Sequence, residues 1–272
     1  MRTVAIRMCW VMGMVAAVRL AAADGEPPTA AELIAKVDGA MWFYDRQDKL
    51  GGYTAQVGTV QGSVKPGAPL PPPGKTTVVG PVSMDAKART KSLPALTPGC
   101  GPWRLSTLVG FEIGLFARPW AEQFPEGEYD RTVEAGSGVG SVLRLVPKAP
   151  IGTPDMLSPA ISEIRFEIDA EGRPAKGTLK LDMKLGNSPG LLTFEFEDHG
   201  GKKRARRILH TIENFNLKIA PILEFAYAPQ TKLDLPSRIA FRVDGGSLSG
   251  VLAGQDHITY YVFEGYKVAK SK

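Results

Sequence analysis

Cysteine and histidine are scarce in this chain, which has 2 cysteines and 3 histidines in 272 residues. Cys9 lies in an apolar N-terminal run, so Cys100 is the single thiol outside that run. One thiol supports neither an internal disulfide framework nor a thiolate zinc site. His199, His210 and His257 lack metal-ligand spacing and are predicted to be surface or turn residues. The sequence therefore predicts no metal site and no cofactor.

A long apolar run is also missing. The run at residues 8–18 is too short to span a bilayer, which takes about 20 residues. It follows Arg2 and Arg7 and precedes Ala21-Ala22-Ala23, which is the order of a secretory signal peptide; a retained membrane anchor is the alternative. Residues 1–23 contain no twin arginine. We therefore expect export by the general secretory route to the periplasm or the extracellular space.

Little excess charge remains without that segment. Removing residues 1–23 takes away three arginines and no acidic residue, which lowers the net charge from +5 to +2. Domains that bind nucleic acid carry a concentrated basic face, so no nucleic-acid partner is predicted. One basic run stands out, and it is read either as a solvated hairpin edge that discourages aggregation or as a contact for an anionic membrane or an acidic envelope protein. Its cations are Lys202, Lys203, Arg204, Arg206 and Arg207.

Catalytic motifs are missing as well. The stretch Gly246-Ser-Leu-Ser-Gly250 has Leu248 where a nucleophile elbow needs serine. The glycine-rich residues 136–140 lead into a strand, so they offer no helix N-terminus to a phosphate. Acidic pairs such as Glu195 and Glu197 share one strand face and are predicted to be solvated. The sequence predicts that the protein is not an enzyme.

An amphipathic helix is predicted near the start of the expected mature chain, which spans residues 24–272. Thr29 and Glu32 have the spacing of a capping box. Leu33, Val37 and Met41 recur at helical spacing behind it. We expect the helix to run to about Gln47 and to be stopped by the glycine pair at 51–52.

The remaining pattern is mostly that of strands. Apolar and polar residues alternate at 164–168, 179–185, 192–196 and 239–243, and strands are also predicted at 53–64, 75–84 and 142–146. One dry and one wet face indicate an antiparallel sheet. The proline-rich residues 66–74 form either an exposed connector or a polyproline segment for a partner. Residues 93–124, rich in aromatics, are predicted to form short helices and turns.

The width of such a sheet limits the architecture. Eight or more strands at about 4.8 Å spacing make a sheet roughly 40 Å wide. A helix is only about 10–12 Å across, so one helix cannot cover the dry face. We therefore expect a single domain in which the sheet curls around its helices and the aromatic segment covers the rest. Its interior is either an apolar container or a filled core.

The order of elements resembles the periplasmic lipoprotein-carrier superfamily, which includes outer-membrane lipoprotein carriers and lipoprotein-sorting-like exported proteins. The resemblance is carried by the helix at 32–37, the strands at 142–148 and 161–174, and the segments at 235–239 and 258–268. It implies an α+β fold: an open half-barrel of antiparallel strands with an N-terminal helix and further short helices on its concave face. It also implies an apolar cavity for acyl chains, no catalysed reaction and no cofactor.

Two functions of different kinds follow. The first is an exported carrier of lipid acyl chains or lipoproteins. The second is an envelope structural or interaction protein with the same fold and a filled cavity. Beside these two, an uncharacterised hydrolase is a further alternative. A contiguous apolar cavity favours the carrier, and a close-packed interior opposes it. The candidate lipid contacts, each of which is alternatively ordinary core, are Trp42, Trp103, Phe111, Phe116 and Trp120.

Overall fold

The computed structural model describes the larger part of the chain. The described residues are 27–47, 50–64, 77–85, 90–92, 106–136, 140–152, 159–183, 186–214, 217–230, 233–244 and 256–270. The expected signal peptide, the proline-rich residues 66–74, Cys100 and Trp103 lie outside them.

Within these ranges the chain forms three helices and one twelve-stranded sheet. The helices are α1 (Ala30–Ala40), α2 (Ser106–Gly114) and α3 (Trp120–Gln123). The strands are β1 (Leu50–Val64), β2 (Thr77–Asp85), β3 (Thr90–Ser92), β4 (Tyr129–Ala135), β5 (Ser141–Pro147), β6 (Ala160–Ile168), β7 (Pro174–Met183), β8 (Gly186–His199), β9 (Lys202–Asn214), β10 (Leu217–Gln230), β11 (Leu233–Asp244) and β12 (Asp256–Lys270). One large antiparallel sheet with few helices is therefore confirmed.

The strand order follows from simple hairpins. Strands β4 to β12 are neighbours in chain order, and β1 pairs with β12, so the sheet reads β3-β2-β1-β12-β11-β10-β9-β8-β7-β6-β5-β4 with every neighbouring pair antiparallel. Tight turns join these hairpins. Gly200 and Gly201 join β8 to β9 with φ of 57° and 82°, a region that glycine enters without steric cost. Asp169 Oδ1 accepts the amides of Glu171 and Arg173 in the β6–β7 turn.

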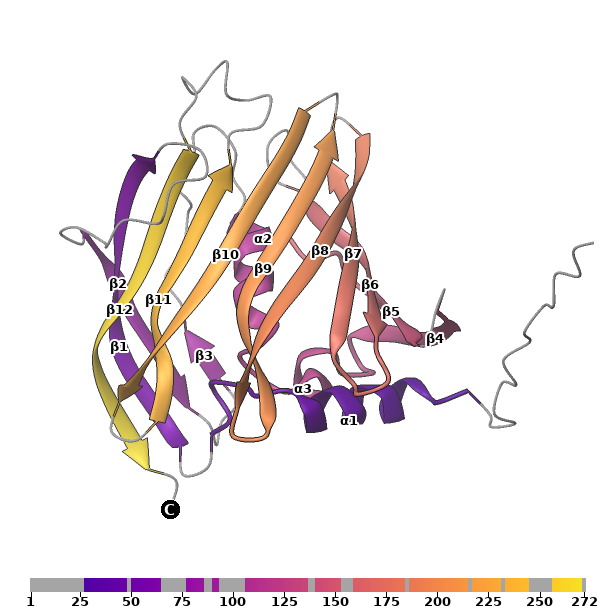
Figure 1. Cartoon of the computed structure of the whole chain (residues 1–272), viewed down its shortest axis with the longest axis horizontal. Coiled ribbons are helices and arrows are strands. Elements are labelled where there is room, and N and C mark those ends of the chain that lie inside the picture. The colour runs from indigo at the N-terminus through magenta and orange to yellow at the C-terminus, as the bar shows by residue number, and fades with distance from the viewer. Residues whose placement is uncertain are drawn as a thin grey trace, which may run out of the picture.

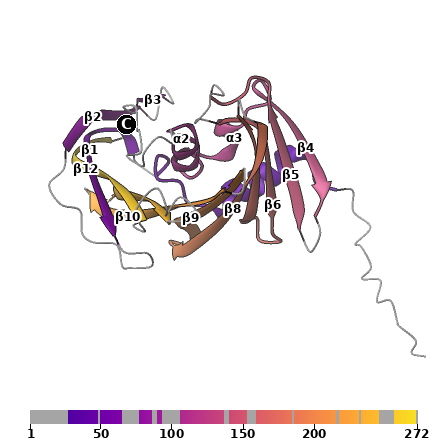
Figure 2. The same cartoon turned by 90° about the horizontal axis from the view of Figure 1, so that it is seen from above.

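The sheet is curved, and α2 and α3 lie on its concave side (Figure 2). The side chains of Val57, Leu143, Leu179, Leu192 and Ile239 are 0% exposed, which places the hydrophobic core along the inner face. Helix α1 runs along one end of the strands, beside the β6–β7 and β8–β9 turns (Figure 1). The core therefore lies between the concave face and the helices.

Helix α1 begins as predicted and ends earlier. The capping box is present, since the Thr29 amide donates to Glu32 Oε2 at 2.8 Å and the Glu32 amide donates to Thr29 Oγ1 at 3.2 Å. The helix ends at Ala40, so the prediction of an end near Gln47 was wrong. Met41 takes an extended conformation and bridges to Lys203 of β9, and the Trp42 amide donates to the Lys203 carbonyl at 2.8 Å. Pairing with the β8–β9 hairpin thus overrides the helical period.

Candidate functional site

A pair of ionisable side chains is buried between α2 and the sheet. Glu112 of α2 and His210 of β9 are each 1% exposed, and Glu112 Oε1 lies 2.5 Å from His210 Nδ1. The prediction that His210 is a surface or turn residue was wrong. His210 shares a strand face with Ile208, whose side chain is 0% exposed, so the two-residue period of β9 carried the signal. The period places an ionisable side chain on the dry face, where it needs a partner.

The imidazole of His210 fits because β8 has no side chain at Gly190. His210 is paired with Leu192 in the sheet, and Gly190 is the next inward position on β8. A Cβ atom on Gly190 would lie 2.4 Å from His210 Nε2 and 3.2 Å from Leu181 Cδ1. The absence of that atom leaves the space that the ring occupies.

Two polar atoms of this pair have no partner. Among the residues that the structure describes, neither Glu112 Oε2 nor His210 Nε2 has a hydrogen-bond partner, although both are buried. A buried polar atom left in this state costs about 1–3 kcal/mol. Such atoms are rare in folded proteins, where an ordered water, an ion, strain or a functional role accounts for them.

Replacing Gly190 by alanine is expected to lower the free energy of unfolding by about 2 kcal/mol, because the new methyl group overlaps the His210 ring and forces it away from Glu112. The measurement is urea unfolding followed by circular dichroism. Gly127→Ala is the matched control, since a Cβ there meets nothing within 4 Å. Equal stabilities for the two variants would contradict the packing described for His210.

The segment that carries Glu112 is held by the chain around α1. Tyr44 Oη donates to the Ile113 carbonyl at 2.9 Å. The Arg46 guanidinium pairs with Glu122. Asp38 accepts the amide of Trp120 at 2.6 Å at the start of α3, and burial raises the pKa of the Asp38 carboxyl although this amide hydrogen bond opposes the rise. The first of these contacts holds α2, next to Glu112, and the other two hold α3.

The predicted lipid-contact residues fall into different places. Phe116 and Trp120 lie together in the interior at 1% and 0% exposure. Trp120 stacks on Phe166 with ring centroids 4.4 Å apart, and its indole N–H donates to the Leu115 carbonyl at 2.9 Å. Phe111 is partly buried against the same core.

Trp42 lies apart from that cluster and Trp103 is outside the described residues. Trp42 packs edge-on against His199 and Tyr227, and the Arg204 guanidinium lies 5.4 Å from its ring centroid. Sequence reasoning missed this contact, because Trp42 and Arg204 are brought together only by the bridge between Met41 and β9.

Most cations of the predicted basic run form ion pairs with acidic side chains of the sheet. Arg204 is 16% exposed and pairs with Glu197 and Asp234, and Arg207 pairs with Glu195 and Glu224. Lys203 pairs with Asp198 at 2.6 Å. Lys202 and Arg206 are exposed. Because β9 has a neighbouring strand on each side, the interpretation of the run as a solvated edge was wrong for Arg204 and Arg207. Lys202 and Arg206 are left for any contact with an anionic surface.

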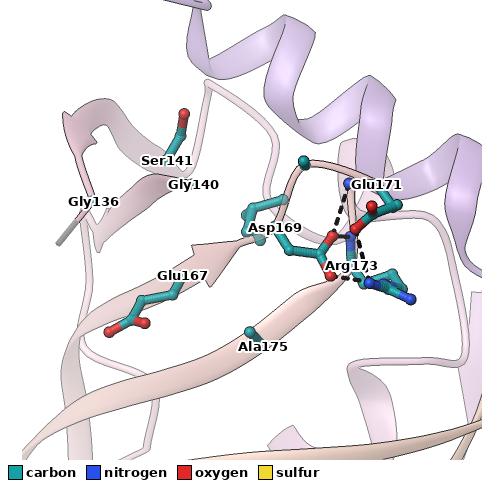
Figure 3. Close-up of a pocket in the computed structure, with 10 residues that line it drawn as sticks. Gly136, Gly140, Ser141, Glu167, Asp169, Glu171, Arg173 and Ala175 are labelled. Atoms are coloured by element: carbon teal, nitrogen blue, oxygen red, sulfur yellow. Dashed lines mark hydrogen bonds and ion pairs between the residues drawn. The ribbon is translucent and has the colours of Figure 1, made fainter. Parts of the chain in front are cut away.

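A second feature is an open pocket of about 440 Å³ where the β6–β7 turn faces the start of β5 (Figure 3). Its most polar members already satisfy each other, since Arg173 Nε donates to Asp169 Oδ2 at 2.6 Å and the Arg173 amide donates to Asp169 Oδ1. Its remaining lining includes Gly136, Gly140 and Glu167. The hydrogen bonds of Asp169 and Arg173 build the turn, so these two side chains are already paired with each other.

In the described part of the chain, no three His, Cys, Asp or Glu side chains are placed to share a metal ion, and no helix has the length and apolar character to cross a membrane. No family model, curated protein or solved structure matches the chain.

Proposed function

We propose that the protein is an exported, non-enzymatic carrier that binds acyl chains of lipids or lipoproteins against the inner face of an open half-barrel. The observation that carries the proposal is the width of the curved apolar face. Twelve strands at about 4.8 Å spacing span roughly 50 Å. A helix is about 10–12 Å across, so α2 and α3 match only part of that width. This geometry accords with the resemblance to the lipoprotein-carrier superfamily.

The proposed acyl site lies beyond α2, on the inner faces of β1, β2, β11 and β12. The other half of the concave side, at β6 to β8, is already packed by Phe116, Trp120 and Phe166. The apolar side chains proposed to contact the acyl chain are Val57, Val82, Ile239 and Phe263. All four belong to the inner-face core, and none carries a polar atom.

A second function has support of its own. The Trp120 cluster is close-packed, with several edge-on ring pairs such as Trp120 with Phe124 at 5.6 Å. If the same packing continues across the whole inner face, the protein is an envelope structural or interaction protein with a filled interior.

The deciding experiment is to isolate the full chain from bacterial envelopes and to identify bound acyl lipids by mass spectrometry. We expect close to one acyl lipid per chain. Displacement of the apolar fluorescent probe N-phenyl-1-naphthylamine measures binding in solution. Absence of both lipid and probe binding would refute the carrier and favour the filled interior.

A pair of variants locates the site. Ala55 lies on the inner face of β1 at 4% exposure, whereas Ala135 of β4 is exposed. Ala55→Phe is expected to weaken probe binding at least about tenfold by occupying the space of the acyl chain, and Ala135→Phe to leave it unchanged. Equal binding by both variants would place the ligand elsewhere.

A further inference from the structure

Strand β4 is the outermost strand at one end of the sheet, and no described strand lies beyond it (Figure 2). It is 7 residues long and pairs with β5 along its whole length without a register shift. A bulge, a proline or a lysine commonly guards such a free edge, and Tyr129–Ala135 contains none of these. The edge is therefore regular and open to pairing with a further strand.

Two hydrogen bonds just beyond the ends of β4 show which of its backbone groups face outward. The Lys148 amide donates to the Glu128 carbonyl at 2.8 Å, and the Gly136 amide donates to the Gly140 carbonyl at 3.2 Å. In antiparallel pairing such bonded positions recur at every second residue, so the even-numbered residues of β4 are bonded to β5. The odd-numbered residues that turn both their N–H and C=O groups to the free edge are Arg131, Val133 and Ala135.

The side chains of β4 form two rows of different chemistry. The inner row includes Tyr129 and Val133, which pack against the core. Arg131 belongs to the same row, is 11% exposed and pairs with Glu126 at 2.6 Å, so its charge is already met. The outer row is exposed, carries two carboxylates and consists of Asp130, Thr132 and Glu134. An added strand would therefore meet an apolar inner row and an acidic outer row.

The acidic outer row decides between occupants of this edge. Two copies of β4 paired antiparallel around Thr132 would place Asp130 of each copy opposite Glu134 of the other. Like charges directly opposite each other destabilise a strand pair, and opposite charges stabilise it. In the described part of the chain Glu134 is paired with Arg165, whereas Asp130 forms no ion pair. A second copy of this chain is therefore disfavoured, and a strand with basic side chains is favoured.

We propose that β4 binds an extended segment of another protein as an additional antiparallel strand. Main-chain hydrogen bonds hold the segment, and its alternate side chains provide the selectivity. Lysine or arginine side chains of the segment lie in the outer row, opposite Asp130 and Glu134, and apolar side chains continue the inner row beside Val133. The inference is separate from the carrier function, because β4 lies at the opposite end of the strand order from the acyl site proposed at β1 and β2.

The test measures the binding of fluorescently labelled peptides to the unaltered full chain by fluorescence anisotropy. The peptide Thr-Lys-Val-Lys-Val-Lys-Thr is compared with Thr-Glu-Val-Glu-Val-Glu-Thr, and we expect it to bind at least about fivefold more tightly. Methylating both valine amides removes the donors that face β4 and is expected to abolish binding, whereas methylating the lysine amides, which face away, is expected to preserve it. No binding of the lysine peptide, equal binding of the lysine and glutamate peptides, or binding that survives methylation of the valine amides would overturn the proposal.

A charge reversal assigns the preference to the outer row of β4. Asp130→Lys is expected to lower the ratio of the two affinities at least about fivefold, because the lysine peptide then meets like charge. Glu264→Lys changes an exposed glutamate of β12, opposite Gln56 of β1, and is expected to keep the ratio of the unaltered protein. A ratio that persists in Asp130→Lys would place the peptide elsewhere and refute the proposal.

A change of the backbone tests the edge itself. Val133→Pro removes an N–H that faces away from β5 and leaves the bonds between β4 and β5 in place. It is expected to weaken the lysine peptide at least about fivefold more than Val133→Ala, which keeps that N–H. Equal binding by these two variants would contradict pairing at this edge. Sedimentation of the unaltered chain as a dimer that Val133→Pro separates would show that the edge binds a second copy instead, and the proposal would be wrong.

Discussion

Replacing Glu112 by leucine while His210 stays in place is expected to lower the free energy of unfolding by about 3 kcal/mol, because an imidazole is left buried without its partner. His210→Leu is expected to cost a similar amount, since it strands the Glu112 carboxylate in the interior. Urea unfolding measured by circular dichroism gives each value. The reason is the burial of both side chains, which are 0% and 1% exposed.

The double variant Glu112→Leu with His210→Leu is expected to recover to within about 1 kcal/mol of the unaltered protein, because buried ion pairs are often matched or exceeded by apolar side chains. The exposed pair of Arg165 and Glu134, at 43% and 42% exposure, is the control cycle and is expected to show a coupling below about 1 kcal/mol. The opposite result is a double variant whose loss in free energy of unfolding equals the sum of the two single losses. It would show that Glu112 and His210 are each stabilised by contacts other than their mutual hydrogen bond.

A recovered double variant would bear on why the buried pair is present. If leucines at both positions fold as well as the natural pair, stability does not account for the presence of Glu112 and His210.

Most of the sheet was predictable because its signal is local. The two-residue alternation at 164–168, 179–185, 192–196 and 239–243 falls within β6, β7, β8 and β11, apart from residues 184–185 outside the described range. Each alternation arises because one face of the strand packs against the core and the other face meets solvent. The end of α1 was not predictable in this way, because the residue that ends it, Met41, is set by its bridge to Lys203, 162 positions further along the chain.

The candidate site was hidden from the sequence for a related reason. Glu112 and His210 are separated by 98 positions, and Gly190 comes from a third element. The only local sign was that His210 falls on the dry face of β9 with Ile208. The polar neighbours of His210 suggested a surface residue, whereas strand parity placed it inside. The basic run suggested solvated cations, whereas Arg204 and Arg207 are paired in the sheet. Their glutamate partners include residues on neighbouring strands, which the local sequence does not reveal.

Trp120→Ala is expected to lower the free energy of unfolding by about 4 kcal/mol, the largest effect of any substitution considered. The indole is 0% exposed, its ring lies against Phe166 and meets Phe124 edge-on, and its N–H donates to the Leu115 carbonyl. Trp42→Ala is the matched control. Its side chain is partly exposed and packs on Arg204, so a loss of about 1 kcal/mol is expected.

The same variant separates the two interpretations of Trp120, core residue and lipid contact. As core, it supports the β6–β8 half of the interior, and the folded fraction of Trp120→Ala is expected to bind N-phenyl-1-naphthylamine with unchanged affinity. As a wall of the acyl site, its removal would change probe affinity and leave the free energy of unfolding within about 1 kcal/mol of the unaltered protein. The packing of Trp120 favours the first outcome, because an indole that is 0% exposed in contact with Phe166 and Phe124 has no face left for a ligand.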